Sequence, residues 1–167
     1  DGRVVLDTTA PVITVLSVAF TNQAAYQLRY TADDVEHTET RTLVEGDNTF
    51  TIDAFDIFSN KSVASFHVTL DTVAPVGTLK INNGDAETNN RAVRLDITAQ
   101  DASPLKDIRF STDGGSHWTD WSAFDSLKII TLPDGEGLKT ITCQVRDQAG
   151  NTATISSAIR YLSPVRF

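Results

Sequence analysis

The sequence predicts an all-β protein built from two β-sandwiches in tandem. Two observations predict this fold. Apolar and polar residues alternate along several short segments, and the second half of the chain repeats features of the first. Turn sequences such as NNGD, PDGEG and QAGN separate the alternating segments, and none of the segments carries a convincing helical stripe.

The alternation has a period of two residues, which is typical of strands with one buried face. Each alternating set therefore predicts the inward face of a strand. In the first half the sets are Tyr26, Leu28 and Tyr30, then Phe50 and Ile52, then Ala64, Phe66, Val68 and Leu70; in the second half they are Val93, Leu95, Ile97 and Ala99, then Ile141, Cys143 and Val145.

A repeat divides the chain. The segment LDTTAP (Leu6–Pro11) recurs as LDTVAP (Leu70–Pro75), and TFTIDAFDIFSN (49–60) aligns with TITCQVRDQAGN (140–151). Proline fixes its own φ and restricts the preceding residue, so these short linkers are predicted to be stiff.

From this repeat we predict a first domain over 7–70 and a second over 71–167. Residues 1–6 would form the tail strand of an upstream repeat or an N-terminal extension.

The linker D-T-x-A-P and the closing hairpin D-x-x-G-N resemble those of bacterial Ig-like domains. The resemblance is closest in VRDQAGN, whereas the first unit has Ser59 where glycine is usual. It implies two tandem Ig-like (Greek-key) β-sandwiches joined by a short stiff linker. It also implies an extracellular or cell-surface location, neighbouring Ig-like repeats as partners, and in some arrays calcium at the domain junctions.

Composition narrows the classes of function. The net charge of −8 disfavours nucleic acid as a partner, and no apolar run is long enough for membrane insertion. A single cysteine excludes an intrachain disulfide, and Cys143 is predicted to be a small buried apolar residue.

No known catalytic motif is present, and the three histidines, His37, His67 and His117, are scattered. We therefore predict a protein that is not an enzyme and that requires no cofactor.

Acidic residues recur at the end of each sandwich where the chain enters. Carboxylates from three loops are the ligands that calcium takes, but Asp and Asn are also the usual turn residues, so calcium and plain turn chemistry both remain open. The candidate calcium ligands are Asp71, Asp101, Asp147 and Asn151 in the second unit, and Asp7, Asp34 (with Asp33) and Asp56 (with Asn60) in the first.

The segment STDGGSHW (111–118) resembles the Asp box of sialidases and other sugar-active propellers. A propeller repeats its Asp boxes, and this chain has one, so we predict a structural hairpin in which Asp113 bonds nearby amides. The alternative is a carbohydrate site in which Trp118 and Trp121 stack on sugar rings. A sialidase-type enzyme fragment is the weakest hypothesis, since only the Asp box favours it.

The sequence thus predicts a non-catalytic spacer or adhesion module of a bacterial cell-surface or secreted protein. The alternative is a carbohydrate-binding accessory domain of a secreted polysaccharide-active enzyme. Besides neighbouring repeats, surface glycans or proteins are the partners that these functions would require.

Overall fold

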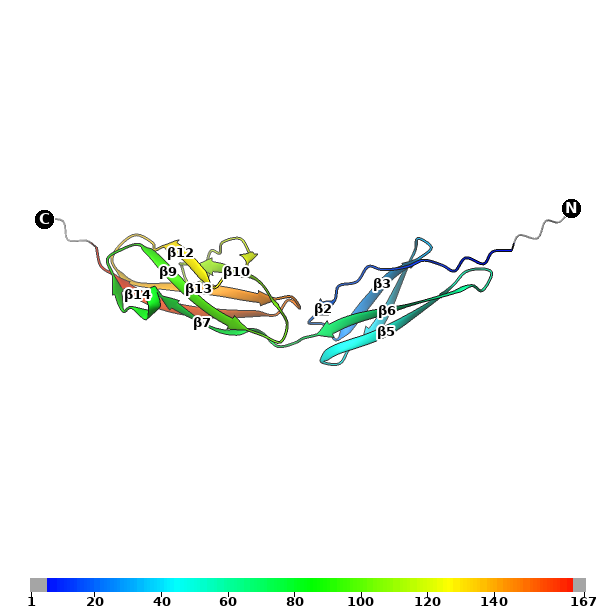
Figure 1. Ribbon diagram of the computed structural model, residues 1–167. Coiled ribbons are helices and arrows are strands. Elements are labelled where there is room, and N and C mark those ends of the chain that lie inside the picture. Colours follow the sequence, from blue (N-terminus) through cyan, green and yellow to red (C-terminus); the bar gives the residue numbers. More distant parts are fainter. Residues whose placement is uncertain (1–5, 164–167) are drawn as a thin grey trace. The chain divides into compact units, whose positions relative to one another are not determined.

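The computed structural model describes residues 6–163, and strands dominate it (Figure 1). The chain divides into two compact units, Asp1–Thr72 and Val73–Phe167, here called unit 1 and unit 2. Among the described residues, no helix has the length and apolar character needed to cross a membrane. Of the predicted tail strand over 1–6, residues 1–5 lie outside the described part, and Leu6 belongs to no strand.

Unit 1 consists of two three-stranded sheets, with strand orders β1-β3-β4 and β2-β6-β5. All its pairings are antiparallel except the short pairing of β2 with β6. The strands are β1 (Ile13–Val15), β2 (Phe20–Thr21), β3 (Ala25–Ala32), β4 (Val35–Thr42), β5 (Gly46–Phe55) and β6 (Lys61–Leu70).

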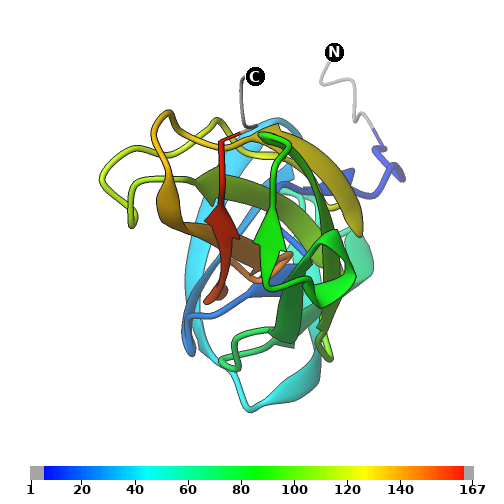
Figure 2. The ribbon, with the colours of Figure 1, turned by 90° about the vertical axis from the view of Figure 1, so that its left-hand side faces the viewer.

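Unit 2 consists of a five-stranded sheet, β11-β10-β13-β14-β8, and a three-stranded sheet, β12-β9-β7. Figure 2 shows β8 beside β14 at the edge of the larger sheet. The elements are β7 (Val76–Ile81), the 3₁₀ turn η1 (Asn82–Gly84), β8 (Glu87–Thr88), β9 (Ala92–Gln100), β10 (Leu105–Ser111), β11 (Ser122–Ala123), β12 (Leu127–Thr131), β13 (Gly137–Asp147) and β14 (Thr152–Tyr161).

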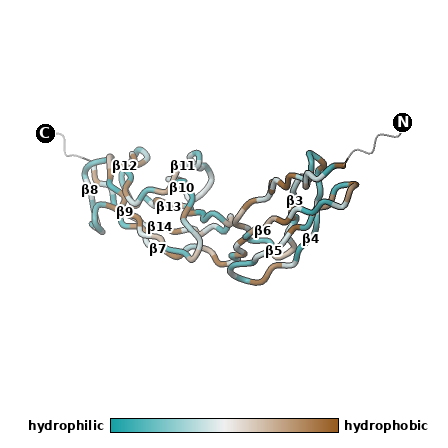
Figure 3. Tube along the Cα trace, turned by 45° about the vertical axis from the view of Figure 1, so that its right-hand side comes forward, coloured by the Kyte–Doolittle hydropathy of each residue, from teal (hydrophilic) through white to brown (hydrophobic). Residues whose placement is uncertain are grey.

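The strands follow the predicted alternation, and hydrophobic and hydrophilic residues alternate along the trace (Figure 3). In unit 1, Tyr26, Leu28 and Tyr30 of β3 are buried against β5 and β6. Phe50 and Phe66 lie at the margin of this core, because both side chains are only partly buried.

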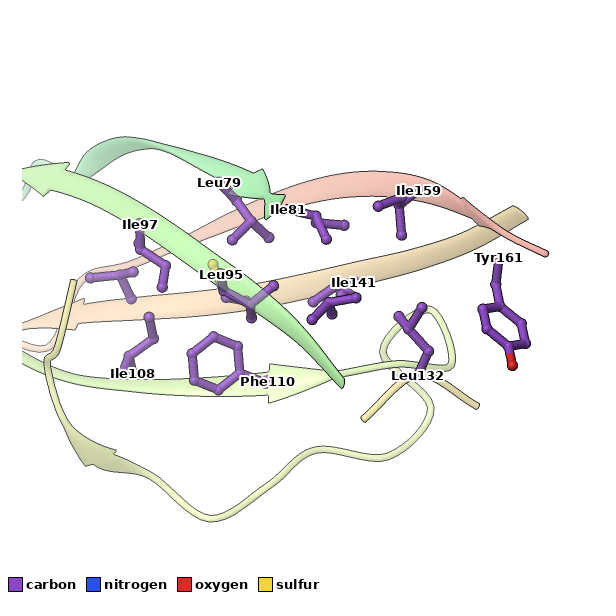
Figure 4. Packing of buried hydrophobic residues seen from close by; sticks show 13 residues of the cluster. Leu79, Ile81, Leu95, Ile97, Ile108, Phe110, Leu132, Ile141, Ile159 and Tyr161 are labelled. Carbon is purple, nitrogen blue, oxygen red and sulfur yellow. The ribbon is translucent and has the colours of Figure 1, made fainter. Parts of the chain in front are cut away.

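The core of unit 2 lies between its two sheets (Figure 4). Leu95 and Ile97 of β9 pack in one cluster with Ile108 and Phe110 of β10. Cys143 is buried in the same cluster, as predicted, and burial raises the pKa of its thiol to about 11. The thiol therefore acts as a small apolar group at neutral pH.

The two units differ by an insertion. In unit 1, Asp33 and Asp34 form the two-residue turn that joins β3 directly to β4, and both have positive φ, as hairpin turns of this kind require. In unit 2, β12 pairs with β9 in the same antiparallel manner, but β10 and β11 come between them in the chain. The insertion adds two strands to the larger sheet and carries the Asp-box segment.

Candidate functional site

The closing turn of unit 1 is built on Asp56. Its Oδ1 accepts the backbone N–H groups of Phe58 and Asn60, each at 2.8 Å, and its Oδ2 accepts the side-chain amide of Asn60 at 2.7 Å. The same Asn60 amide donates to the carbonyl oxygen of Asp7 at 3.0 Å. The closing turn therefore holds the segment through which the chain enters unit 1.

Asp147 builds the closing turn of unit 2 in the same way. Its Oδ1 accepts the backbone N–H groups of Gly150 at 2.6 Å and Asn151 at 2.8 Å, and its Oδ2 accepts the Asn151 side chain at 2.9 Å. The Asp147 side chain is fully buried. The turn chemistry considered for Asp56, Asn60, Asp147 and Asn151 is thus present in both units.

Two of the predicted calcium ligands lie near each other in unit 2. Asp101 and Asp147 each offer one carboxylate oxygen, and these oxygens lie within 4.8 Å of each other. Asp71 lies in unit 1, where its backbone N–H donates to Thr21 O. Oxygens around one calcium ion sit about 2.3–2.6 Å from it, so the spacing and the donor type fit calcium. Asp101 also has a local role, because its Oδ1 accepts the N–H of Ser103 at 3.0 Å.

Within residues 6–163, the corresponding acids of unit 1 belong to no group of three or more clustered carboxylates. Asp34 lies in the β3–β4 turn, and Asp33 Oδ1 accepts the N–H of Val12 at 2.9 Å. Asp7 Oδ1 accepts the N–H of Thr9 at 2.9 Å. The repeat predicted a carboxylate site in each unit. Unit 1 lacks the β10–β11 insertion, and its β3 therefore ends in the tight turn that leads directly to β4.

Each unit holds its last strand through a short parallel pair that the alternation of residues does not predict. In unit 1, Thr69 N of β6 donates to Ala19 O beside β2 at 2.8 Å; in unit 2, Arg160 N of β14 donates to Ala86 O beside β8 at 3.0 Å. We call these pairs the parallel clamps. Two-residue strands are too short to show periodicity. A second bond completes each clamp, from Asp71 N to Thr21 O at 3.0 Å and from Leu162 N to Thr88 O at 2.9 Å.

The two predicted sugar-stacking residues face arginines of their own unit. The guanidinium carbon of Arg109 lies 4.8 Å from the ring centroid of Trp118 and 4.6 Å from that of Trp121. Arg146 lies 4.3 Å from the Trp121 centroid. We call these four residues the Trp–Arg stack. Cation–π contacts of this kind attract each guanidinium to the ring.

Two polar partners hold the arginines of the stack. Asp107 accepts two bonds from Arg146, at 2.9 Å from Nε and 2.6 Å from Nη2, and this contact raises the pKa of the Arg146 guanidinium. Gln144 accepts the Nε of Arg109 at 2.8 Å. Neither arginine could be assigned to this site from local sequence, because their proximity to the tryptophans depends on the pairing of β10 with β13.

The Asp-box segment forms the loop between β10 and β11, with Asp113 at its centre. Asp113 accepts the N–H of His117 at 2.9 Å and the hydroxyl of Ser111 at 2.7 Å, and its Oδ2 lies 2.6 Å from His117 Nδ1. The bond from the His117 backbone, followed by those from the His117 and Ser111 side chains, lowers the pKa of Asp113. Gly114 and Gly115 both have positive φ. These contacts are the turn chemistry predicted for Asp113.

An open cleft of about 380 Å³ lies beside this loop, lined in part by Asp113, His117, Trp118 and Ile130. A Cβ on Gly115 would lie 3.3 Å from Cζ2 of Trp118, so the loop backbone also packs against this indole ring. Trp118 is therefore contacted by Arg109 and by its own loop.

The strands, sheets and cores define an Ig-like β-sandwich fold for the chain. No family model matches the sequence, and no curated protein matches it. Among solved structures, the fibronectin(III)-like modules of Clostridium thermocellum CbhA are similar at 12% identity and a TM-score of 0.51, over 91% of this chain and 94% of that chain. At this identity the likeness shows the fold, and it confirms the predicted all-β sandwich.

Two further solved structures are similar at lower TM-scores. The PKD1 domain of Vibrio anguillarum Epp matches at 18% identity and a TM-score of 0.41, covering 55% of this chain and 98% of that chain. A tetra-tandem repeat from the extending region of a large adhesion protein matches at 19% identity and a TM-score of 0.39, over 92% of this chain and 50% of that chain.

Proposed function

We propose that this chain is a non-catalytic spacer and adhesion module of a bacterial cell-surface or secreted protein, and that it carries tension along its length outside the cell. The parallel clamps are the observation that carries this proposal. They occur in both units, at corresponding places, although the units differ in size and in strand number.

The clamps would bear load because the two strands of each clamp run parallel. When two strands run parallel, pulling the chain at both ends of the unit slides one strand along the other. Their hydrogen bonds then lie across the force and must break together. An antiparallel hairpin pulled open at one end loses its bonds one at a time, and so resists less force.

The fixed entrance of unit 1 supports the spacer role. Asn60 bonds the carbonyl of Asp7, and the hydroxyl of Ser62 donates to the carbonyl of Pro11. Together with the restricted geometry of Ala10-Pro11, these bonds hold the entering chain against unit 1.

The repeat supports a place among further sandwiches. Leu70, which ends β6, is only 4% exposed in the core of unit 1, whereas Leu6, its counterpart in the repeated LDTxAP segment, is 84% exposed. A preceding sandwich would bury Leu6 as unit 1 buries Leu70. The acidic composition suits a module that stays soluble beside its neighbours.

Single-molecule force spectroscopy on the full chain, tethered at its two ends, tests this function. We expect two unfolding steps, one for each unit. Arg160→Pro removes the clamp donor of unit 2 and should lower the force of one step only. Ala158→Pro is the matched control, since Ala158 lies on the same strand and precedes the residues that pair with β8. Equal unfolding forces for Arg160→Pro and Ala158→Pro would contradict the load-bearing role.

The carbohydrate-binding alternative depends on free tryptophan faces. The Trp–Arg stack engages these rings within the protein, so we favour the spacer role. Tryptophan fluorescence that responds to a soluble neutral glycan would reverse this preference. Turnover of a fluorogenic glycoside would contradict a non-catalytic module.

A further inference from the structure

Unit 1 carries an exposed apolar surface at the end where the chain enters. It consists of Val35, Phe55, Ile57 and Phe58, here called the apolar tip. Ile57 is 91% exposed, and each of the other three is at least 53% exposed. The loop between β5 and β6 shows the colour of hydrophobic residues (Figure 3). Large apolar side chains gathered at one exposed place indicate an interaction site, whereas single ones do not.

The fold of unit 1 does not need these side chains. Asp56 holds the loop through backbone N–H groups and the side chain of Asn60. The turn therefore does not require apolar side chains at positions 57 and 58. None of the four belongs to the buried core of unit 1 or to the hydrophobic residues packed against that core.

Unit 2 is an internal comparison, because it forms the same turn with other residues. In the alignment of the two closing segments, Phe55 corresponds to Arg146, Ile57 to Gln148 and Phe58 to Ala149. Both turns keep the aspartate and the asparagine that fix the backbone. The apolar tip is therefore a property of unit 1 and not a requirement of the repeat.

The four residues line an open cleft of about 540 Å³ with acidic walls. Asp7, Asp33 and Asp56 line the same cleft, together with His37, and the described lining contains no lysine or arginine. Lys61 lies near Phe55, but it forms an ion pair with Asp53 at 2.8 Å. The cleft thus presents apolar side chains beside carboxylates whose charge is offset by no lysine or arginine of the lining.

We propose that the apolar tip binds a protein segment in which apolar side chains are flanked by lysine or arginine. Charge complementarity selects this occupant. In a second copy of the same chain, the carboxylates of the two clefts would face each other and repel. An anionic lipid surface would be repelled for the same reason. This inference goes beyond the spacer function and does not need it, since a spacer with an inert tip would still carry tension.

A model peptide of alternating leucine and lysine tests the proposal on the full, isotope-labelled chain by NMR. We expect shift changes confined to residues near 33–37 and 55–60, with affinity that falls as salt rises. Two further peptides separate the contributions. Leucine alternating with glutamate keeps the apolar side chains and reverses the charge, and serine alternating with lysine keeps only the charge. Neither should bind.

Two variants locate the site. Ile57→Ser removes one exposed apolar side chain without touching the turn bonds and should weaken binding about tenfold. Gln148→Ser, at the same position of unit 2, should leave binding unchanged. Asp33→Asn keeps an Oδ1 acceptor for Val12 and a residue suited to positive φ, so the fold is retained; it should weaken binding severalfold and reduce the salt dependence.

The proposal is wrong under any of four outcomes. The serine–lysine peptide could bind as well as the leucine–lysine peptide, or Ile57→Ser could bind as the unaltered chain does. The shift changes could centre on another surface. Finally, the chain could sediment with vesicles of anionic lipid and be released by Ile57→Ser, in which case the tip binds a membrane surface.

Discussion

The side-chain amide of Asn60 donates to Oδ2 of Asp56 over 2.7 Å. This bond closes the last turn of unit 1, and through the same amide it reaches the segment where the chain enters. Asp56 therefore closes the turn and, through Asn60, helps to anchor the entering segment. The contacts of the folded state stabilise its ionised form.

Acid should weaken unit 1 through Asp56. The bond from Asn60, with those from the backbone, lowers the pKa of Asp56 from its ordinary value of 3.8. A lowered pKa in the folded state stabilises the protein above the ordinary pKa, and this stabilisation is lost as the pH falls through the folded-state pKa. We expect the urea midpoint of unit 1, followed by its amide signals, to fall below about pH 4.

Asp56→Asn is the matching variant, since it keeps an acceptor for the backbone amides but cannot titrate. It should be less stable at neutral pH and should depend less on pH below about pH 4. An unchanged acid dependence in this variant would show that Asp56 does not contribute to it.

Removing a core side chain of unit 1 should cost more than removing one at its margin. Leu28 is completely buried, so Leu28→Ala should destabilise unit 1 by about 2–5 kcal/mol. Phe50→Ala should cost less, because Phe50 is partly exposed and packs at the edge of the cluster. Urea unfolding of both variants measures the difference, and an equal cost would place Phe50 in the core.

The Trp–Arg stack should contribute to the stability of unit 2. Arg109→Ala removes two cation–π contacts and should cost about 1–2 kcal/mol. Both tryptophans lie in unit 2, so their emission reports this change directly. Arg94→Ala is the control, since the exposed ion pair of Arg94 with Asp96 should contribute less than about 1 kcal/mol. Unchanged emission and stability in Arg109→Ala would show that the stack is not formed in solution.

Calcium binding stays a prediction. The neighbouring carboxylates of Asp101 and Asp147 in unit 2 repel each other, and a divalent cation would offset this repulsion. We expect the melting temperature in millimolar calcium to exceed that in EDTA, because a ligand of the native state stabilises it. Asp101→Asn keeps the acceptor for Ser103 and should reduce the rise.

Asp125→Asn is the control for calcium. Asp125 accepts the N–H of Leu127 two residues on, as Asp101 does for Ser103, but it lies outside the carboxylate group. If calcium raises the melting temperature equally in both variants, or does not raise that of the unaltered chain, these acids serve only as turn residues.

Local chemistry made much of the fold predictable. Alternation at Tyr26, Leu28 and Tyr30 set the buried face of a strand before any partner was known. Glycines 114 and 115 marked a turn with positive φ, and the repeated aspartate and asparagine marked both closing turns. Each of these signals depends only on neighbours in the chain.

The long strands, their inward faces, the turns and the repeat are readable from local sequence, because side-chain direction and turn geometry depend on residues close together in the chain. The two-residue strands are not, and which strands meet depends on the packing of each unit. This packing paired β2 with β6, brought Arg109 to Trp118 and Trp121, and left Ile57 and Phe58 exposed. These contacts join residues whose local sequence is compatible with other partners, so packing of the whole unit selects among them.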